Sequence, residues 1–245
     1  MKIMITVGFV ALLIATLAFW QHGMEATFRK RNENSQRVRR WKRNTILAVL
    51  GWLGYITLLS TSNILTDMES PLRIPILVLL PITGFITYFF LSNKFKVFVM
   101  YFPKPMTVYG QTLRIAVELL IYGSYVQGVI PAHATFEGYN LSILVGISAP
   151  VVGCMAYISK TMSTQTLIGW NVLGLGLLAV ETFVFMTTLI CPELCGLEHT
   201  FAPQFGTMPY LLLLSVFIPS AAFMHMVSIA QTLIPARRKV QRQYA

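Results

Sequence analysis

Seven stretches of mainly apolar residues follow one another along this chain, each long enough to cross a lipid bilayer as a helix. A hydrocarbon core of about 30 Å needs about 20 such residues. The stretches cover residues 3–20, 45–62, 74–92, 112–130, 141–159, 167–190 and 209–234. Of the 245 residues, 55% are hydrophobic and only 11% are charged, which is too little charge to cover a soluble domain of this length. We therefore expect an all-α polytopic membrane protein, with seven transmembrane helices in one domain over residues 1–245.

The basic residues predict how the chain is threaded. Cytoplasmic segments of membrane proteins are enriched in lysine and arginine. Segments on one predicted side hold sixteen basic residues, while the other side holds Lys2 and Arg73. This asymmetry predicts an outer N-terminus and a cytoplasmic C-terminus. The sixteen residues are Arg29, Lys30, Arg31, Arg37, Arg39, Arg40, Lys42, Arg43, Lys94, Lys96, Lys104, Lys160, Arg237, Arg238, Lys239 and Arg242.

The net charge of +10 would suggest a nucleic-acid partner in a soluble protein. Here the basic segment from Arg29 to Arg43 is explained as a topology determinant that contacts the bilayer and its anionic lipid headgroups, so we expect no nucleic-acid partner. Residues 93–111 mix lysine with aromatic residues and contain Pro103 and Pro105. We expect this segment to lie on the cytoplasmic leaflet.

A weak internal repeat is visible between the two halves of the chain. "ITVGFVALLIATLAFW" from Ile5 aligns without gaps on "ILVGISAPVVGCMAYI" from Ile143, and "VLGWLG" from Val49 is similar to "VLGLG" from Val172. This order resembles the three-plus-one-plus-three duplication of the SWEET and PQ-loop transporters, which implies the same threading. The Pro203–Gln204 pair falls in an outer loop, so the motif of those families is not carried over.

A second resemblance covers more of the chain. "RIAVELLIYGSYVQGVIPAHATFEGYNLSILVGISAP", from Arg114 to Pro150, together with "WNVLGLGLL" and "IPSAAFMHMVSIAQTLI", is similar to a group of uncharacterised bacterial seven-helix membrane proteins without an established activity. The resemblance implies a multi-pass protein of the bacterial inner membrane.

The fourth apolar stretch carries a polar face. Gln111, Arg114, Glu118, Tyr122 and Tyr125 are spaced three or four residues apart, which places them on one side of a helix. Arg114 and Glu118 are one turn apart, and we expect them to pair, because pairing lowers the cost of removing both charges from water. Such a face is expected to point into the protein.

The sixth and seventh stretches contribute further polar residues at depth. With a rise of about 1.5 Å per residue, Asn171 and His225 fall in the cytoplasmic half, level with Arg114 and Glu118, and Glu181 lies nearer the centre. We expect a polar pocket between the fourth, sixth and seventh helices. Glu181 would carry a proton or cation, or donate a hydrogen bond when neutral, and His225 would pass a proton toward Glu118. Alternatively, these residues only join helices through hydrogen bonds.

Three prolines, Pro81, Pro150 and Pro219, lie near the middle of predicted spans. Each removes a backbone donor and usually kinks its helix. In a bilayer, the freed carbonyl needs a partner inside the protein. We expect these helices to contact one another or a wet cavity, although proline is also simply commoner in membrane helices.

Cys191 and Cys195 lie in a predicted outer loop. They could form a disulfide across a short turn or stay unpaired. A metal site with His199 is the third reading, although the spacing matches no recognised zinc pattern.

No catalytic motif, phosphate-binding loop or facing histidine pair occurs in the sequence, so we expect no cofactor and do not expect an enzyme. The buried ionisable residues favour a transporter-like or channel-like protein that handles a small solute or protons. One alternative is a subunit or assembly factor of a larger membrane complex, with a membrane-protein partner or a second copy of the chain. A second alternative is a seven-helix membrane sensor.

Overall fold

The computed structural model describes all residues except 1, 68–69, 196–199 and 234–245. Within these described residues every regular element is helical. The α-helices are α1 (Lys2–Lys30), α2 (Ser35–Thr61), α3 (Leu80–Leu91), α4 (Asn93–Tyr101), α5 (Lys104–Tyr109), α6 (Leu113–Val126), α7 (Ile143–Gly153), α8 (Thr164–Ile190) and α9 (Ile218–Leu233). Three π-helical segments are η1 (Pro75–Leu79), η4 (Cys154–Ile158) and η7 (Leu213–Phe217). Short 3₁₀ segments are η2 (Gly110–Thr112), η3 (Ala132–Ala134), η5 (Pro192–Cys195) and η6 (Pro203–Gly206).

Four helical segments are long and apolar enough to cross a membrane: Ile3–Lys30, Ser35–Thr61, Thr164–Ile190 and Leu213–Leu233. A fifth candidate is the run Pro75–Leu91, bent by 81° against Asn93–Tyr101, and Ile143–Ile158 is apolar but shorter. The described chain is thus all-helical with several long apolar helices, as a membrane-embedded protein requires. Each of the seven apolar stretches in the sequence is largely helical, whereas the number that span a bilayer stays a prediction.

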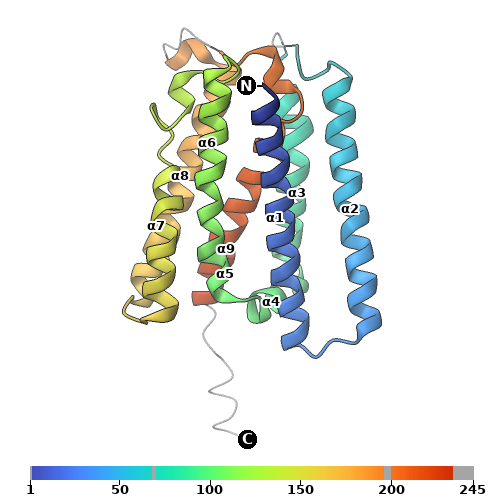
Figure 1. The fold of residues 1–245 in the computed structure, drawn as a ribbon, viewed down its shortest axis with the longest axis vertical. Helices are drawn as coiled ribbons and strands as arrows, with labels where there is room; N and C mark the ends of the chain where they lie inside the picture. The colour runs from blue at the N-terminus through green and yellow to red at the C-terminus, as the bar shows by residue number, and fades with distance from the viewer. Residues whose placement is uncertain (1, 68–69, 196–199, 234–245) are drawn as a thin grey trace, which may run out of the picture.

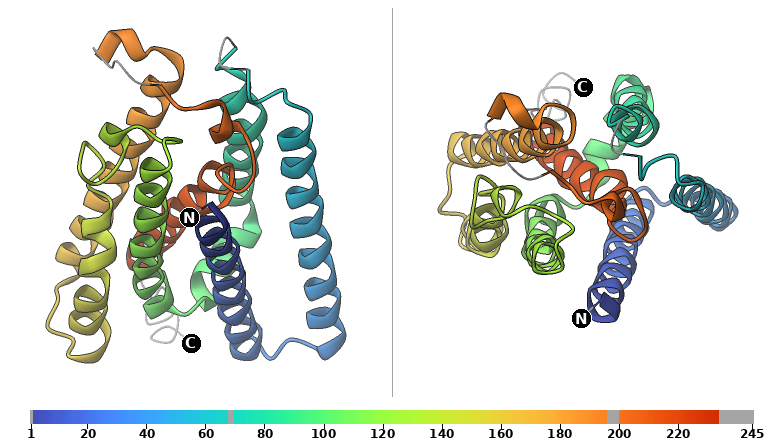
Figure 2. Two further views of the ribbon diagram at one scale, coloured as in Figure 1. Left: turned by 45° about the horizontal axis from the view of Figure 1, so that its top comes forward. Right: turned by 90° about the horizontal axis from the view of Figure 1, so that it is seen from above.

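Helix α9 lies at the centre of the bundle, and α2 lies at its edge (Figures 1 and 2). Within the most apolar 18 residues of Leu213–Leu233, 61% are buried, against 6% within the most apolar 18 residues of α2. Helices α6, α7 and α8 pack on one side of α9, and α1 and α3 lie on the other (Figure 2). The polar residues of α6, α8 and α9 are therefore enclosed by other helices.

Two of the three prolines, Pro81 and Pro219, come shortly after a π-helical segment. Segment η1 ends two residues before Pro81, η7 ends two residues before Pro219, and η4 follows Pro150. A proline lacks an N–H and its ring displaces the carbonyl four residues earlier, and a π-helical turn is one way for a helix to absorb this change.

Helix α2 supplies hydrogen-bond donors to two of the carbonyls that the prolines leave without their usual partner. Trp52 Nε1 donates to the Ser215 carbonyl at 3.2 Å, and the Tyr55 hydroxyl donates to the Leu77 carbonyl at 3.0 Å. Ser215 is four residues before Pro219 and Leu77 four residues before Pro81. The prediction that these carbonyls find partners inside the protein is confirmed for both, and the partners come from an edge helix.

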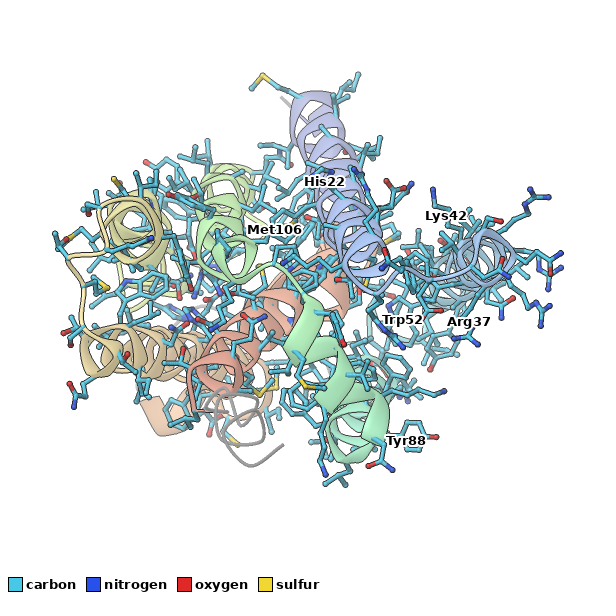
Figure 3. The ribbon with its side chains drawn as sticks, turned by 90° about the horizontal axis from the view of Figure 1, so that it is seen from below. His22, Arg37, Lys42, Trp52, Tyr88 and Met106 are labelled. Carbon is cyan, nitrogen blue, oxygen red and sulfur yellow. The ribbon has the colours of Figure 1, made fainter. Side chains whose placement is uncertain are left out.

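Most of the sixteen basic residues that predict the threading lie at one end of the bundle, which we call the basic end. The turn between α1 and α2 lies at this end, as do α4 and the start of α5 (Figure 1). The connection between α7 and α8 and the end of α9 lie there too. At the α1–α2 turn, Lys42 Nζ lies 2.7 Å from Glu25 Oε1, and Arg37 lies 2.8 Å from Glu33. Figure 3 shows Lys42 and Arg37 on the α2 side of the molecule.

Residues 93–111 divide into two parts, and their expected place on the cytoplasmic leaflet stays a prediction. Residues Asn93–Tyr101 form α4, which lies across the basic end (Figure 1). Gln231 Nε2 donates to the free carbonyls of Val99 and Phe102 at the end of α4. Residues 104–111, however, continue into α6 as one helical column, because Pro105 occupies the first turn of α5, where a missing N–H costs nothing.

Candidate functional site

Three charged side chains meet in the interior near the end opposite to the basic end. Arg114 Nη2 of α6 lies 3.0 Å from Glu181 Oε2 of α8. The Ser142 hydroxyl donates to the same carboxylate oxygen at 2.6 Å. Asn140 Nδ2 donates to Glu118 Oε2 at 2.8 Å. We call Arg114, Glu118, Glu181, Asn140 and Ser142 the acid cluster.

The loop before α7 positions the two neutral members of the acid cluster. Asn140 Oδ1 accepts a hydrogen bond from the Ser142 backbone N–H at 3.1 Å, a turn that asparagine favours. This turn aims the Asn140 amide at α6 and the Ser142 hydroxyl at α8. Gly146 lets α7 approach closely, because an added Cβ there would lie 3.4 Å from Arg114 Cβ and 3.0 Å from the Ile115 nitrogen.

The charges of the acid cluster do not balance. Arg114, Glu118 and Glu181 are only 3%, 0% and 1% exposed. If both carboxyl groups are ionised, the set carries one negative charge in excess, which is costly away from water. Glu118 Oε1 and Arg114 Nη1 are also buried without a hydrogen-bond partner. The cluster can therefore accept one proton or one cation.

Two predictions about these residues were wrong. Arg114 pairs with Glu181, not with Glu118 one turn away on the same helix. Glu118 also lies deeper than expected, because the helical column begins at Lys104. Fourteen residues of helix place Glu118 about 21 Å from that start, beside the loop at the far end.

A second polar group, which we call the imidazole cluster, lies closer to the basic end. His225 Nδ1 of α9 is 2.9 Å from Asn171 Oδ1 of α8. Asn171 Nδ2 donates to Ser228 Oγ at 3.0 Å and to the Leu167 carbonyl at 2.8 Å. His225 is fully buried, and its Nε2 has no hydrogen-bond partner. Trp170 packs against the imidazole, with ring centroids 5.4 Å apart.

Glycine at position 174 makes room for the imidazole. An added Cβ at Gly174 would lie 2.3 Å from His225 Cε1 and 2.5 Å from Nε2. Gly174 is three residues after Asn171, so the imidazole lies along α8 with Nδ1 at Asn171 and with Cε1 and Nε2 against Gly174. The close α8–α9 contact is typical of small residues at membrane helix crossings.

The six candidate residues are thus divided between separate places. The single layer expected for Arg114, Glu118, Asn171 and His225 was wrong, since Arg114, Glu118 and Glu181 form one cluster, and Asn171 and His225 form another. Tyr122 belongs to neither, because its ring stacks on Phe136 of the loop before α7 with centroids 5.0 Å apart.

Several polar residues at this site were missed by sequence reasoning. Asn140 and Ser142 precede an apolar stretch in "GYNLS", which reads only as a turn. Gln111 was part of the predicted polar face, but its contacts were not foreseen. It is buried, donates to the Ala221 carbonyl at 3.0 Å and leaves its Oε1 without a partner among the described residues. Tyr157 of η4 interacts with Ser228 and Thr107, which extends the imidazole cluster toward the basic end.

Of the three readings left open for Cys191 and Cys195, the structure favours unpaired thiols, since Cys191 is a free thiol. The side chain of Cys195, and His199 with it, lies outside the described residues. Among the described residues no group of three or more His, Cys, Asp or Glu side chains is arranged to hold a metal ion.

Comparisons of the chain with protein-family models, with curated proteins and with solved structures found no match.

Proposed function

We propose that this chain is a bacterial inner-membrane protein that binds protons in its interior and moves them, alone or together with a small solute, between α6, α8 and α9. In this proposal the chain spans the membrane seven times, with the N-terminus outside and the basic end in the cytoplasm. The basic end then faces anionic lipid headgroups. The three-plus-one-plus-three repeat would relate α1–α3 to α7–α9.

The observation that carries this proposal is the excess carboxyl group of the acid cluster. One guanidinium and two carboxyl groups are all at most 3% exposed. A protein that needed only to join helices could use uncharged hydrogen bonds at lower cost. A buried acid without a counter-charge is expected to hold a proton, and such residues mark proton pathways in membrane proteins.

The hydrogen bonds indicate which acid exchanges its proton. One carboxylate oxygen of Glu181 accepts hydrogen bonds from both the Arg114 guanidinium and the Ser142 hydroxyl. The ionised form of Glu181 is therefore well stabilised. One carboxylate oxygen of Glu118 accepts a hydrogen bond from the neutral Asn140 amide, and the other oxygen has no partner among the described residues. We therefore assign the exchangeable proton to Glu118 and the permanent negative charge to Glu181.

Proton flux into vesicles tests this proposal. The purified chain is reconstituted into liposomes that contain a pH-sensitive dye, and a pH gradient and a membrane potential are applied. We expect a flux above that of empty liposomes, lost in Glu118→Gln and retained in Glu193→Gln, which changes an exposed carboxyl group in the outer loop. Absence of flux with every gradient, or equal flux in both variants, would contradict the proposal.

The sparse packing of α2 favours a second candidate function, a subunit of a larger membrane complex. Apart from Trp52, Ile56 and a few neighbours, α2 presents its surface outward, and only 6% of its apolar window is buried. A partner helix would cover this face as well as lipid does. Purification in a mild detergent distinguishes the two, since a stoichiometric partner that is lost when Leu50 and Leu58 are changed to alanine favours the subunit function.

A further inference from the structure

The hydrogen bonds around Asn171 determine which nitrogen of His225 carries the proton. The Asn171 amide has two N–H donors, which are used by the Leu167 carbonyl and by Ser228 Oγ. Asn171 Oδ1 must therefore accept the hydrogen bond from His225 Nδ1. A neutral His225 is thus protonated at Nδ1 and presents the lone pair of Nε2.

This lone pair belongs to a base that no other side chain uses among the described residues. Nε2 is buried without a partner there and lies against Gly174, one helical turn along α8 from Asn171. The seven residues from Gly174 to Glu181 span about 10 Å along α8 and place both positions on one face of the helix. The imidazole cluster thus contains an unused proton acceptor on the face of α8 that also carries Glu181.

The net charge of the buried groups connects the two clusters. Arg114 of α6 interacts with the imidazole electrostatically. Tyr157 of η4 interacts with Ser228, which bonds Asn171 beside the ring. Glu181 lies about 10 Å further along α8. Arg114 also acts on Glu118. With one proton shared between Glu118 and His225, the charges of Arg114, His225, Glu118 and Glu181 sum to zero wherever that proton resides.

We propose that His225 Nε2 is the second binding site of the proton that Glu118 exchanges. This inference rests on the proposed function and adds a proton-binding site on the cytoplasmic side of Glu118. In one state Glu118 is neutral and His225 is neutral. In the other state the O–H bond of Glu118 has broken, an N–H bond has formed at Nε2, and an imidazolium and a second carboxylate are present. No other atom gains or loses a proton, and the buried set stays neutral in both states.

The unpartnered atoms between the two sites support a route for this transfer. Gln111 Oε1 and Arg114 Nη1 are buried without hydrogen-bond partners, and Gln111 is one helical turn from Arg114 toward the basic end. Together with Glu118 Oε1 and His225 Nε2, they provide polar atoms through the interior from one cluster to the other. On the cytoplasmic side, Tyr157 is half-buried and connects Ser228 to the surface of the bundle.

Nitrogen NMR of ¹⁵N-histidine in the full chain, reconstituted in lipid nanodiscs, tests the inference. We expect neutral His225 to be protonated at Nδ1. We also expect Glu118→Gln to lower the ratio of imidazolium to imidazole at His225 about tenfold at a fixed acidic pH. This magnitude corresponds to a separation on the order of 10 Å between the two charges in a medium with an effective dielectric constant of about 20. Glu193→Gln is the matched control and should leave the ratio unchanged, and His22→Gln removes the signal of an exposed histidine for assignment.

Other outcomes overturn the inference. A neutral His225 protonated at Nε2, or an imidazolium ratio that is the same in Glu118→Gln and the wild type, would show that the two groups do not share a proton. Proton flux in vesicles is measured in parallel, and flux that depends on Glu118 without this coupling would retain the proposed function and remove only the role of His225. The Glu118→Gln measurement keeps His225 intact, so the test does not depend on whether His225→Gln folds.

Discussion

Arg114 Nη2 and Glu181 Oε2 lie 3.0 Å apart, although 67 positions separate the two residues in the chain. The pair joins α6 to α8 in the interior, where Arg114 is 3% and Glu181 is 1% exposed. Removing one partner from a buried ion pair leaves an uncompensated charge, whereas replacing both with apolar residues is often neutral. Because of this difference, a comparison of single and double substitutions tests the pair.

We expect Arg114→Met to lower the free energy of unfolding by about 3–5 kcal/mol, because Glu181 would lose its counter-charge. Arg114→Met combined with Glu181→Met should recover most of this loss. Unfolding in mixed detergent micelles, followed by circular dichroism, measures both effects. A double variant as unstable as the single one would show that the pair is not coupled as the structure indicates.

The contact between Gly174 and His225 predicts a strong difference between two glycines of α8. Gly174→Ala should destabilise the protein by about 1–3 kcal/mol, as overpacking does, because its Cβ would occupy the position of the imidazole. Gly176→Ala should be neutral or slightly stabilising, since nothing lies within 4 Å of its added Cβ and alanine favours a helix. Thermal unfolding of the two variants compares them directly, and equal losses would argue against the observed position of the ring.

The hydrogen bond from Trp52 to the Ser215 carbonyl should depend on Pro219. Trp52→Phe keeps an aromatic ring but removes the donor, and we expect a loss of about 1 kcal/mol. In Pro219→Ala, residue 219 regains an N–H that can bond the Ser215 carbonyl within the helix, so Trp52→Phe should then cost less. A double-mutant cycle measures this coupling. Strictly additive effects would show that Trp52 does not compensate for the proline.

The threading of the chain can be tested with thiol labelling, because Cys191 is a free thiol at the end of α8. In a variant with Cys154→Ser and Cys195→Ser, a membrane-impermeant maleimide added to intact cells should label Cys191 after the outer membrane is permeabilised. With Cys191→Ser also present, Lys160→Cys at the basic end should be labelled only after the inner membrane is disrupted. The reverse pattern would mean that the chain is inserted with its basic end outside.

The helices could be predicted from the sequence because their apolar stretches are local features. The apolar stretches predict helical columns, and Figure 1 shows these columns side by side. Irregular helix near Pro81 and Pro219 was also predictable, since a missing N–H acts within one helical turn.

The acid cluster was only partly predictable. Periodicity placed Arg114 and Glu118 on one face, but a rule for residues four apart cannot reveal a partner on another helix, so Glu181 was missed as the counter-charge. The depth of Glu118 was wrong because residues 93–111, with Pro103 and Pro105, were interpreted as a segment outside the helix, whereas Pro105 lies in the first turn of the helical column. Asn140 and Ser142 carry no pattern that connects them to either acid, since a loop residue gains its role only from tertiary packing.

The central claim is that Glu118 holds a buried, exchangeable proton. Infrared difference spectroscopy of the reconstituted protein, recorded while the pH is raised, detects the carbonyl stretch of a protonated carboxyl group directly. We expect one such band that disappears on titration, is absent in Glu118→Gln and persists in Glu193→Gln. A wild-type spectrum without the band, or a band that remains in Glu118→Gln, would contradict the account.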